Sequence, residues 1–184
     1  MGLLAVDENR AFSTSREGLS LLRAMVRRDR NHPSVILYSL FNEEPMQGTA
    51  KGRRLAQRQR SEVRRLDDTR PCTGAFNAGM FERDGAAAVL DVIGINYYLA
   101  AFDRFHVMFP AKPLFSSESL STAPRVANDS AAQIFGNDDE DCADWGNTAR
   151  ETNAAVLARP FVAGLFVWTG FDYRGEPTPY EWPS

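Results

Sequence analysis

Cysteine and histidine are scarce in this chain of 184 residues, which contains two of each. Cys72 and Cys142 lie far apart and match no spacing that is typical of a zinc or redox site. We therefore expect both to be free thiols in the protein core. We also expect the protein to need neither a metal ion nor a cofactor.

The chain also lacks long apolar runs and a strong excess of charge. No apolar run approaches the roughly 20 residues that span a membrane, and the net charge is only -3. The arginine-rich segment 48–66 has no interleaved aromatic residues on which bases could stack. We interpret it as the solvated outer face of a helix. These features predict a protein that binds neither membranes nor nucleic acids.

The first residues lack the basic region and the cleavage site of a signal peptide. If the chain is a fragment, this says little about location. The location therefore stays open, with a soluble protein in the cytoplasm or periplasm of a bacterium as the expectation.

Short apolar segments alternate with segments of helical periodicity along the chain. This alternation is typical of α/β folds with a parallel sheet. Helices are expected from Ser15 to about Arg28, and near residues 48–66, 102–109 and 145–158. Strands are expected near residues 3–7, 35–41, 70–75, 91–96, 113–117 and 162–168. No linker marks a second domain.

Polar side chains follow three of these strands directly. Asn42 and Glu43 come after one strand, Tyr97 after another and Glu118 after a third. In parallel barrels, catalytic side chains occupy the carboxyl ends of the strands. A carboxylate that closes a buried strand needs a reason, because its desolvation is costly unless it is paired or hydrogen-bonded. The pattern therefore indicates an active site with two carboxylates.

Three segments carry a resemblance to a known family. Residues 28–43 have the form Arg-Asp-Arg-Asn-His-Pro-Ser, an apolar strand and then Asn-Glu. Residues 112–118 have Lys-Pro, apolar residues and then Ser-Glu, and residues 168–184 form an aromatic, loop-like segment. Together they resemble glycoside hydrolase family 2. The third segment is similar to one bacterial β-galactosidase branch of that family.

The resemblance implies an α/β protein with a (β/α)8 TIM barrel that is incomplete in this chain. A full barrel needs about 250 residues, and the similarity begins at the third strand and extends to the eighth. We therefore expect residues 1–184 to form part of a TIM-barrel catalytic domain. Its expected partners are the remaining domains of a parent enzyme and another copy in a homo-oligomer.

The resemblance also implies a retaining glycoside hydrolase that cleaves terminal β-D-galactosides by double displacement. Glu43 would be the acid/base and Glu118 the nucleophile. Asn42 would bind the 2-hydroxyl group of the sugar, and Tyr97 would orient the nucleophile. Trp168 would supply an apolar face for the sugar ring, and a non-proline cis peptide bond is expected after it.

Other polar residues near these positions have different interpretations. Glu44 competes for the acid/base role, but the family motif puts the acid directly after the asparagine. Asp7 and Glu8 follow the first strand on the catalytic rim, where we expect them to bond to neighbouring loops. His32 precedes its strand and is expected to be structural. Tyr98 is expected to pack in the interior.

The chain departs from the family pattern at one place. Phe41 stands where the family usually has glycine, and Tyr38 stands where it often has tryptophan. A bulky ring at position 41 beside the site counts against activity. Two alternatives therefore stay open, a β-glucuronidase of the same family and a catalytically inactive barrel fragment that binds carbohydrate. The glucuronidases have an Asn-x-Lys motif beyond the eighth strand, and this chain ends before that region, so the absence of the motif here is weak evidence against them.

Overall fold

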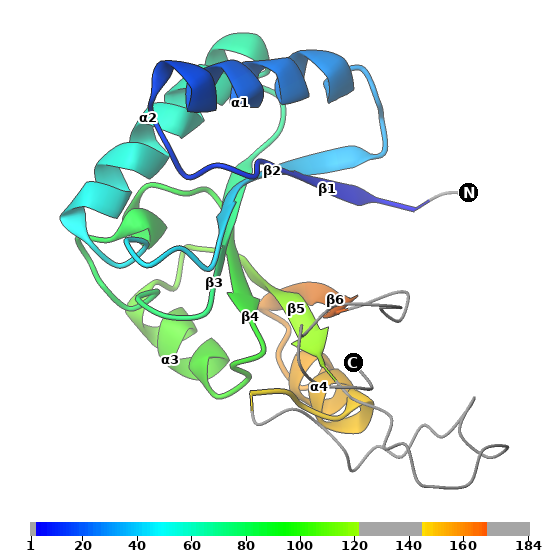
Figure 1. The fold of residues 1–184 in the computed structure, drawn as a ribbon. Helices are drawn as coiled ribbons and strands as arrows, with labels where there is room; N and C mark the ends of the chain where they lie inside the picture. Colours follow the sequence, from blue (N-terminus) through cyan, green and yellow to red (C-terminus); the bar gives the residue numbers. More distant parts are fainter. Residues whose placement is uncertain (1–2, 122–144, 169–184) are drawn as a thin grey trace, which may run out of the picture.

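The computed structural model describes residues 3–121 and 145–168. In these ranges the elements follow in the order β1 (Ala5–Glu8), α1 (Arg16–Asp29), β2 (Val35–Asn42), α2 (Ala50–Leu66), β3 (Cys72–Phe76), η1 (Ala86–Ala88), β4 (Ile93–Asn96), α3 (Ala101–Met108), β5 (Leu114–Leu120), α4 (Ala149–Leu157) and β6 (Val162–Trp168). The predicted alternation of strands and helices is confirmed (Figure 1).

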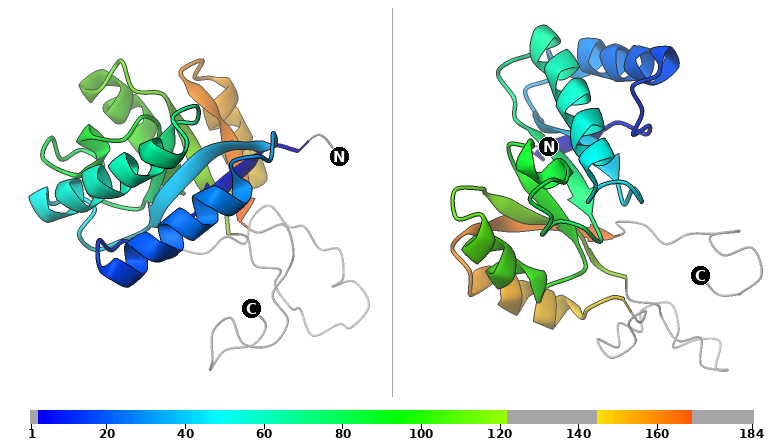
Figure 2. Two further views of the ribbon diagram at one scale, coloured as in Figure 1. Left: turned by 90° about the horizontal axis from the view of Figure 1, so that it is seen from above. Right: turned by 90° about the vertical axis from the view of Figure 1, so that its left-hand side faces the viewer.

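All six strands are parallel and form one sheet in the order β1-β2-β3-β4-β5-β6. Figures 1 and 2 show that the sheet is curled and that the helices lie along its outer side. Because the strands are parallel, their carboxyl ends all lie at the same edge. This is the predicted incomplete (β/α)8 TIM barrel.

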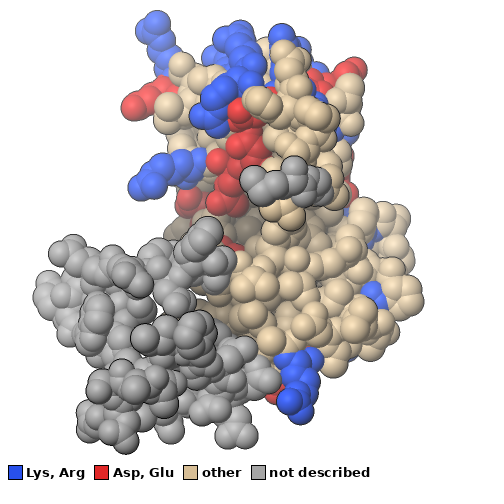
Figure 3. Space-filling model, turned by 90° about the vertical axis from the view of Figure 1, so that its right-hand side faces the viewer, with Lys and Arg blue, Asp and Glu red and all other residues tan. Residues whose placement is uncertain are grey.

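Within residues 3–121 and 145–168, β1 and β6 are the two edges of the sheet. Each of them pairs with one neighbouring strand in these ranges, as predicted for a barrel that does not close. A hollow of about 250 Å³ lies on the inner face, and both edge strands line it, including Glu8 of β1 and Phe166 of β6. Figure 3 shows this open side, with acidic atoms gathered beside the hollow.

The fifth strand is longer than predicted. It runs on to Leu120, so Glu118 lies within the strand and not after it. The expected end at residue 117 is wrong because β5 stays paired with both neighbours. Glu118 lies opposite Asn96 of β4, and Leu120 lies opposite Trp168 of β6.

Helix α1 packs through the apolar face that its sequence predicts. The Ser15 side chain accepts a hydrogen bond from the backbone N–H of Gly18 and caps the start of the helix. Leu22 and Val26 are fully buried, at the spacing of one helical face. The last helix, α4, begins later than predicted, at Ala149, because a capping box forms there.

Helix α2 carries the arginine-rich segment, and part of its charge is paired within the protein. Glu62 is buried and forms ion pairs with Arg23 of α1 and with Arg58 and Arg65 of its own helix. The hydrogen bond from Arg23 lowers the pKa of Glu62. The predicted solvated face is therefore only partly right, because a buried carboxylate needs such partners.

The cysteine prediction can be followed for one of the two residues. Cys72 is a free thiol and is fully buried in β3, and burial raises its pKa to about 12. Cys142 lies outside the described residues. Across residues 3–121 and 145–168, none of the helices has the length and apolar character that crossing a membrane requires.

Phe41 lies in the core, so the expectation that its ring would crowd the site is wrong. The side chain is fully buried between Phe12 and Phe76, whose ring centroids lie 4.3 and 5.1 Å away. A Cβ atom at Gly74 of β3 would come within 2.5 Å of the Phe41 ring. Glycine at position 74 therefore makes the room that this ring occupies.

The variant Gly74→Ala tests this packing. The added methyl group would clash with Phe41, and overpacking of a core costs about 1–3 kcal/mol. We expect a loss of that size in the free energy of unfolding, measured by urea denaturation. The double variant Gly74→Ala/Phe41→Leu should recover part of it, because leucine lacks the ring. A single variant as stable as the wild type would contradict the arrangement.

Candidate active site

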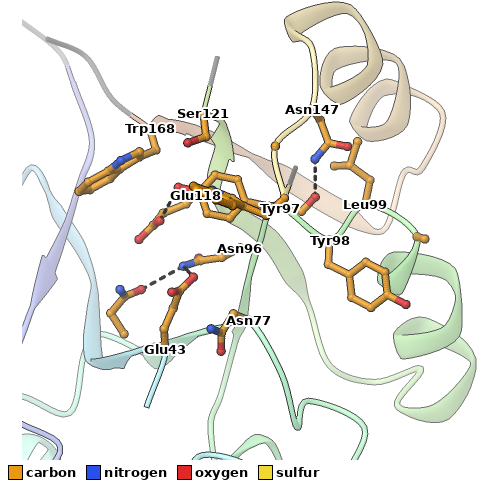
Figure 4. A pocket seen from close by; sticks show the side chains of 14 residues that line it. Glu43, Asn77, Asn96, Tyr97, Tyr98, Leu99, Glu118, Ser121, Asn147 and Trp168 are labelled. Atoms are coloured by element: carbon orange, nitrogen blue, oxygen red, sulfur yellow. Dashed lines mark hydrogen bonds between the residues drawn. The ribbon is translucent and has the colours of Figure 1, made fainter. Parts of the chain in front are cut away.

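A pocket of about 870 Å³ opens at the carboxyl edge of the sheet (Figure 4). This volume lies within the range of small-molecule sites in proteins. Residues at the ends of β2, β3, β4, β5 and β6 line it. The pocket brings together all five of the predicted site residues: Asn42, Glu43, Tyr97, Glu118 and Trp168.

Glu43 enters the pocket from the end of β2. Its backbone N–H donates a hydrogen bond to the carbonyl oxygen of Ala75 at 2.9 Å, and its φ is 51°. A residue other than glycine is strained in this left-handed region, and such strain is concentrated at functional sites. Glu44, the competing carboxylate, is not among the residues that line this pocket.

Tyr97 and Glu118 form a hydrogen-bonded pair across β4 and β5. The hydroxyl group of Tyr97 donates to Oε2 of Glu118 at 2.7 Å, and its backbone N–H donates to the Glu118 carbonyl oxygen at 2.8 Å. Tyr97 also has a positive φ, 55°. Backbone and side chain together hold the tyrosine against the carboxylate, which suits a residue that orients it.

The surroundings of this pair change its proton affinities. Burial raises the pKa of Glu118, and the hydrogen bond from Tyr97 opposes this effect. The nearby charges of Glu43 and Glu8 raise the pKa of Glu118 further. Burial, followed by the hydrogen bond to Glu118, also raises the pKa of Tyr97. The tyrosine is therefore protonated at neutral pH and acts as a donor.

Trp168 ends β6 and lines the same pocket, with 42% of its surface exposed. Figure 4 shows its ring on the same side of the pocket as Glu118. An aromatic side chain offers a large apolar surface together with one polar atom. The predicted cis bond after Trp168 lies outside the described residues.

Asn96 is the main residue of the site that sequence analysis did not single out. It ends β4 and is 1% exposed. Its Nδ2 donates to Oε1 of Glu43 at 2.8 Å and to Oδ1 of Asn42 at 3.0 Å. A signal was present, because Asn-Tyr closes one strand just as Asn-Glu closes another. Asn147 was also missed, and it donates from Nδ2 to the carbonyl oxygen of Tyr97 at 2.6 Å.

The expected packing of Tyr98 in the interior is wrong. Tyr98 is 51% exposed and lines the rim of the pocket. The left-handed backbone at Tyr97 lies where the chain leaves the sheet, so the next residue is no longer held in the strand. His32 lies apart from the pocket, and its carbonyl oxygen accepts a hydrogen bond from Arg70 at 3.1 Å. That contact agrees with a structural role.

Asp7 and Glu8 do not both lie on the rim, which corrects the expectation for Asp7. Glu8 faces the inner hollow, where its Oε2 accepts a hydrogen bond from the Ser39 hydroxyl at 3.0 Å. Asp7 lies near Asp29 of α1, and burial together with that carboxyl raises the pKa of Asp7 to about 6. Neighbouring residues of a strand point to opposite faces, so only one of them can face inward.

Comparison with known proteins agrees with this geometry. Residues 7–135 match the family described as Glycosyl hydrolases family 2, TIM barrel domain. The chain belongs to this family. The match begins in β1 and runs past β5, so it includes both pocket carboxylates, Glu43 and Glu118.

The chain is similar to the β-galactosidase BoGH2A of Bacteroides ovatus, with 33% identity over 89% of this chain and 25% of that protein. It is 24% identical to the β-glucuronidase of Rattus norvegicus over 89% of this chain and 27% of that protein. A solved family 2 glycosyl hydrolase from Bacteroides cellulosilyticus is 30% identical, with a TM-score of 0.67, over 86% of this chain and 17% of that chain. The chain spans about a quarter of the length of these curated relatives.

The raised pKa of Glu118 predicts that this residue makes stability depend on pH. In the folded protein the pKa of Glu118 lies above its ordinary value of 4.5. Below pH 4.5 the carboxyl group is neutral in both the folded and the unfolded protein, so it does not reduce stability. As the pH rises through 4.5 and the folded-state pKa, the free energy of unfolding falls, because the group ionises more readily in the unfolded chain than in its buried site. We expect Glu118→Gln to raise the melting temperature at pH 7 and to leave it unchanged at pH 4.

Thermal unfolding at the two pH values measures this effect. Glu82→Gln is a suitable control, because Glu82 is exposed. The control should not alter the difference between the two pH values. A Glu118→Gln variant that is less stable than the wild type at pH 7 would show that the ionised carboxylate is well solvated.

Proposed function

We propose that this chain carries the catalytic pair of a retaining glycosidase that cleaves terminal β-D-galactosides by double displacement. Glu43 is the acid/base and Glu118 is the nucleophile. The observation that carries the proposal is that carboxylates from two different strands line one pocket, each with its own hydrogen-bond donor. Such a pair of carboxyl groups is the minimum that glycoside hydrolysis requires.

In the first step, a carboxylate oxygen of Glu118 attacks the anomeric carbon of the sugar. The hydrogen bond from Tyr97 to Oε2 holds the Glu118 carboxylate in place for this attack. As the glycosidic bond breaks, Glu43 gives its proton to the leaving oxygen. The products are the free leaving alcohol, a galactosyl ester of Glu118 and an ionised Glu43.

In the second step, water replaces the leaving alcohol beside Glu43. The Glu43 carboxylate takes a proton from this water as the water oxygen attacks the anomeric carbon. The ester bond breaks and Glu118 leaves as a carboxylate. Two inversions give galactose with its β configuration retained, and both side chains return to their starting states.

Asn42 and Trp168 bind the sugar in this proposal. Oδ1 of Asn42 accepts a hydrogen bond from Asn96, so the amide group of Asn42 keeps its N–H donors for a substrate hydroxyl. A bond to the 2-hydroxyl is worth most in the transition state, where positive charge develops at the anomeric carbon. The exposed face of Trp168 packs against the apolar side of the sugar ring.

Two observations favour a galactoside over a glucuronide. The β-galactosidase of Bacteroides ovatus is more similar in sequence than the β-glucuronidase of Rattus norvegicus, at 33% against 24% identity. The segment that follows β6 also resembles the β-galactosidase branch. A panel of 4-nitrophenyl β-glycosides tests the choice, and we expect kcat/KM to be highest for the galactoside. A preference for the glucuronide would favour the second candidate.

The other domains of a longer protein are the partners that we propose for this chain. A sheet whose two edge strands do not pair with each other among the described residues holds catalytic groups poorly, and a working site needs tolerances near 0.5 Å. We therefore expect the 184-residue chain alone to turn over galactosides weakly or not at all. A full-length protein that binds galactosides without cleaving them would favour the carbohydrate-binding alternative.

Variants of the two carboxylates test their separate roles. Glu118→Gln should abolish turnover of every β-galactoside, because the first step needs the nucleophile whatever the leaving group. Glu43→Ala should still release an activated phenol, which needs little protonation. General acid/base assistance accelerates a step by about 10²–10⁴-fold. The slower hydrolysis of the galactosyl-enzyme in Glu43→Ala should therefore be easy to measure. Added azide needs no base and should restore turnover, giving the β-galactosyl azide.

Glu44→Ala is the matched control for Glu43→Ala. It removes the neighbouring carboxylate, which does not line the pocket. We expect turnover close to that of the wild type and no acceleration by azide. Azide rescue in Glu44→Ala but not in Glu43→Ala would exchange the roles of the two residues. Rescue in neither variant would refute the acid/base assignment.

A further inference from the structure

We infer that Asn96 is a positioning residue that selects which oxygen of Glu43 carries the catalytic proton. The inference rests on the proposed acid/base role of Glu43 and concerns a residue to which no role has been assigned above. It follows from three hydrogen bonds that end on one buried side chain. These bonds also link the ends of three strands, β2, β4 and β5.

The donors of Asn96 are both used within the site. Nδ2 donates one bond to Oε1 of Glu43 at 2.8 Å and one to Oδ1 of Asn42 at 3.0 Å. A carboxamide nitrogen has two hydrogens and accepts nothing. Figure 4 shows the Asn96 amide directed toward the side chain of Glu43. Since Asn96 is 1% exposed, solvent does not compete strongly for these donors.

The orientation of the Asn96 amide is fixed from the other side by Ser117. The Ser117 hydroxyl donates to Oδ1 of Asn96 at 2.6 Å. Turning the amide over would exchange its nitrogen and oxygen, break all three bonds and place its oxygen against the Glu43 carboxylate. Gly94 of β4 makes room for this contact, because a Cβ atom there would lie 2.6 Å from the Ser117 hydroxyl oxygen.

The consequence for Glu43 concerns its two oxygens. Oε1 faces an N–H donor and must therefore be an acceptor, so the proton of the acid form sits on Oε2. The same N–H also favours Oε1 when Glu43 is ionised and acts as the base. The Asn96 amide thus holds the Glu43 carboxyl group in one orientation during both steps. Such positioning matters because proton transfer depends on close alignment.

The test compares two galactosides in the full-length protein, one with a 2,4-dinitrophenol leaving group and one with methanol. Breaking the bond to methoxide needs a proton from Glu43, whereas the dinitrophenolate leaves without one. For Asn96→Ala we expect kcat/KM for the methyl galactoside to fall by about 10- to 100-fold, a part of the full acid/base effect. For the dinitrophenyl galactoside we expect a much smaller fall in kcat/KM, because this substrate needs no proton from Glu43 and loses only the support that Asn96 gives to Asn42.

In Asn96→Ala, the second step should also be slower, because Glu43 then acts as the base. With the dinitrophenyl substrate, kcat and KM should fall together, because the galactosyl-enzyme accumulates when its base is misplaced. Azide should raise that kcat. Asn96→Asp keeps the size of the side chain but loses its N–H donors, and it should give the same selectivity between substrates. Ser117→Ala removes the hydrogen bond that fixes the Asn96 amide. It should cause the same selectivity between the two substrates, to a smaller extent.

Ser119→Ala is the matched control on the same strand. The hydroxyl group of Ser119 is more buried than that of Ser117, but it bonds to the Ser116 hydroxyl at 2.7 Å and not to Asn96. We expect this variant to keep the wild-type ratio between the two substrates.

Two results would overturn the role of Asn96. The first is an equal loss on both substrates in Asn96→Ala and Asn96→Asp, because a merely structural residue would act on both alike. The second is no loss at all in either variant. A wild-type protein that cleaves none of the glycosides in the panel would instead refute the proposed function.

Discussion

Parallel pairing of the strands is the constraint on which the whole site depends. A parallel sheet brings the carboxyl ends of all its strands to one edge, whatever their separation in the sequence. Glu43 follows β2 and Glu118 lies near the end of β5, with two strands between them. The curvature of the sheet lets both line one pocket. A flat sheet of the same order would hold them apart.

Hydrogen bonds between strand ends then set the directions of the side chains. Asn96 ties the end of β4 to the end of β2, and Tyr97 ties it to Glu118 of β5. Glu43 and Tyr97 have left-handed backbones, which other residues than glycine adopt at a cost of about 1–3 kcal/mol each. The packed strands beneath them supply the rigidity that sustains this strain.

Much of the fold and of the site was predictable from the sequence. Segment 35–41 is short, almost wholly apolar and rich in β-branched and aromatic residues, which is typical of a strand buried on both faces. The polar residues directly after it mark the edge where a site forms. The length of a strand and the burial of a side chain were harder to predict, because both depend on residues that are distant in the sequence. Glu118 lies within β5 since Asn96 pairs with it, and Phe41 is buried because Gly74 leaves it room. Neither partner is evident from the local sequence.

Covalent trapping tests the central claim, the identity of the nucleophile, most directly. A 2-deoxy-2-fluoro-β-galactosyl fluoride slows both steps of a retaining enzyme but carries a good leaving group, so the glycosyl-enzyme accumulates. Peptide mass spectrometry of the inactivated full-length protein should find one fluorogalactosyl group, on Glu118. Attachment to Glu43, Glu8 or any other residue would contradict the account. So would steady turnover of unmodified galactosides with no adduct at any time.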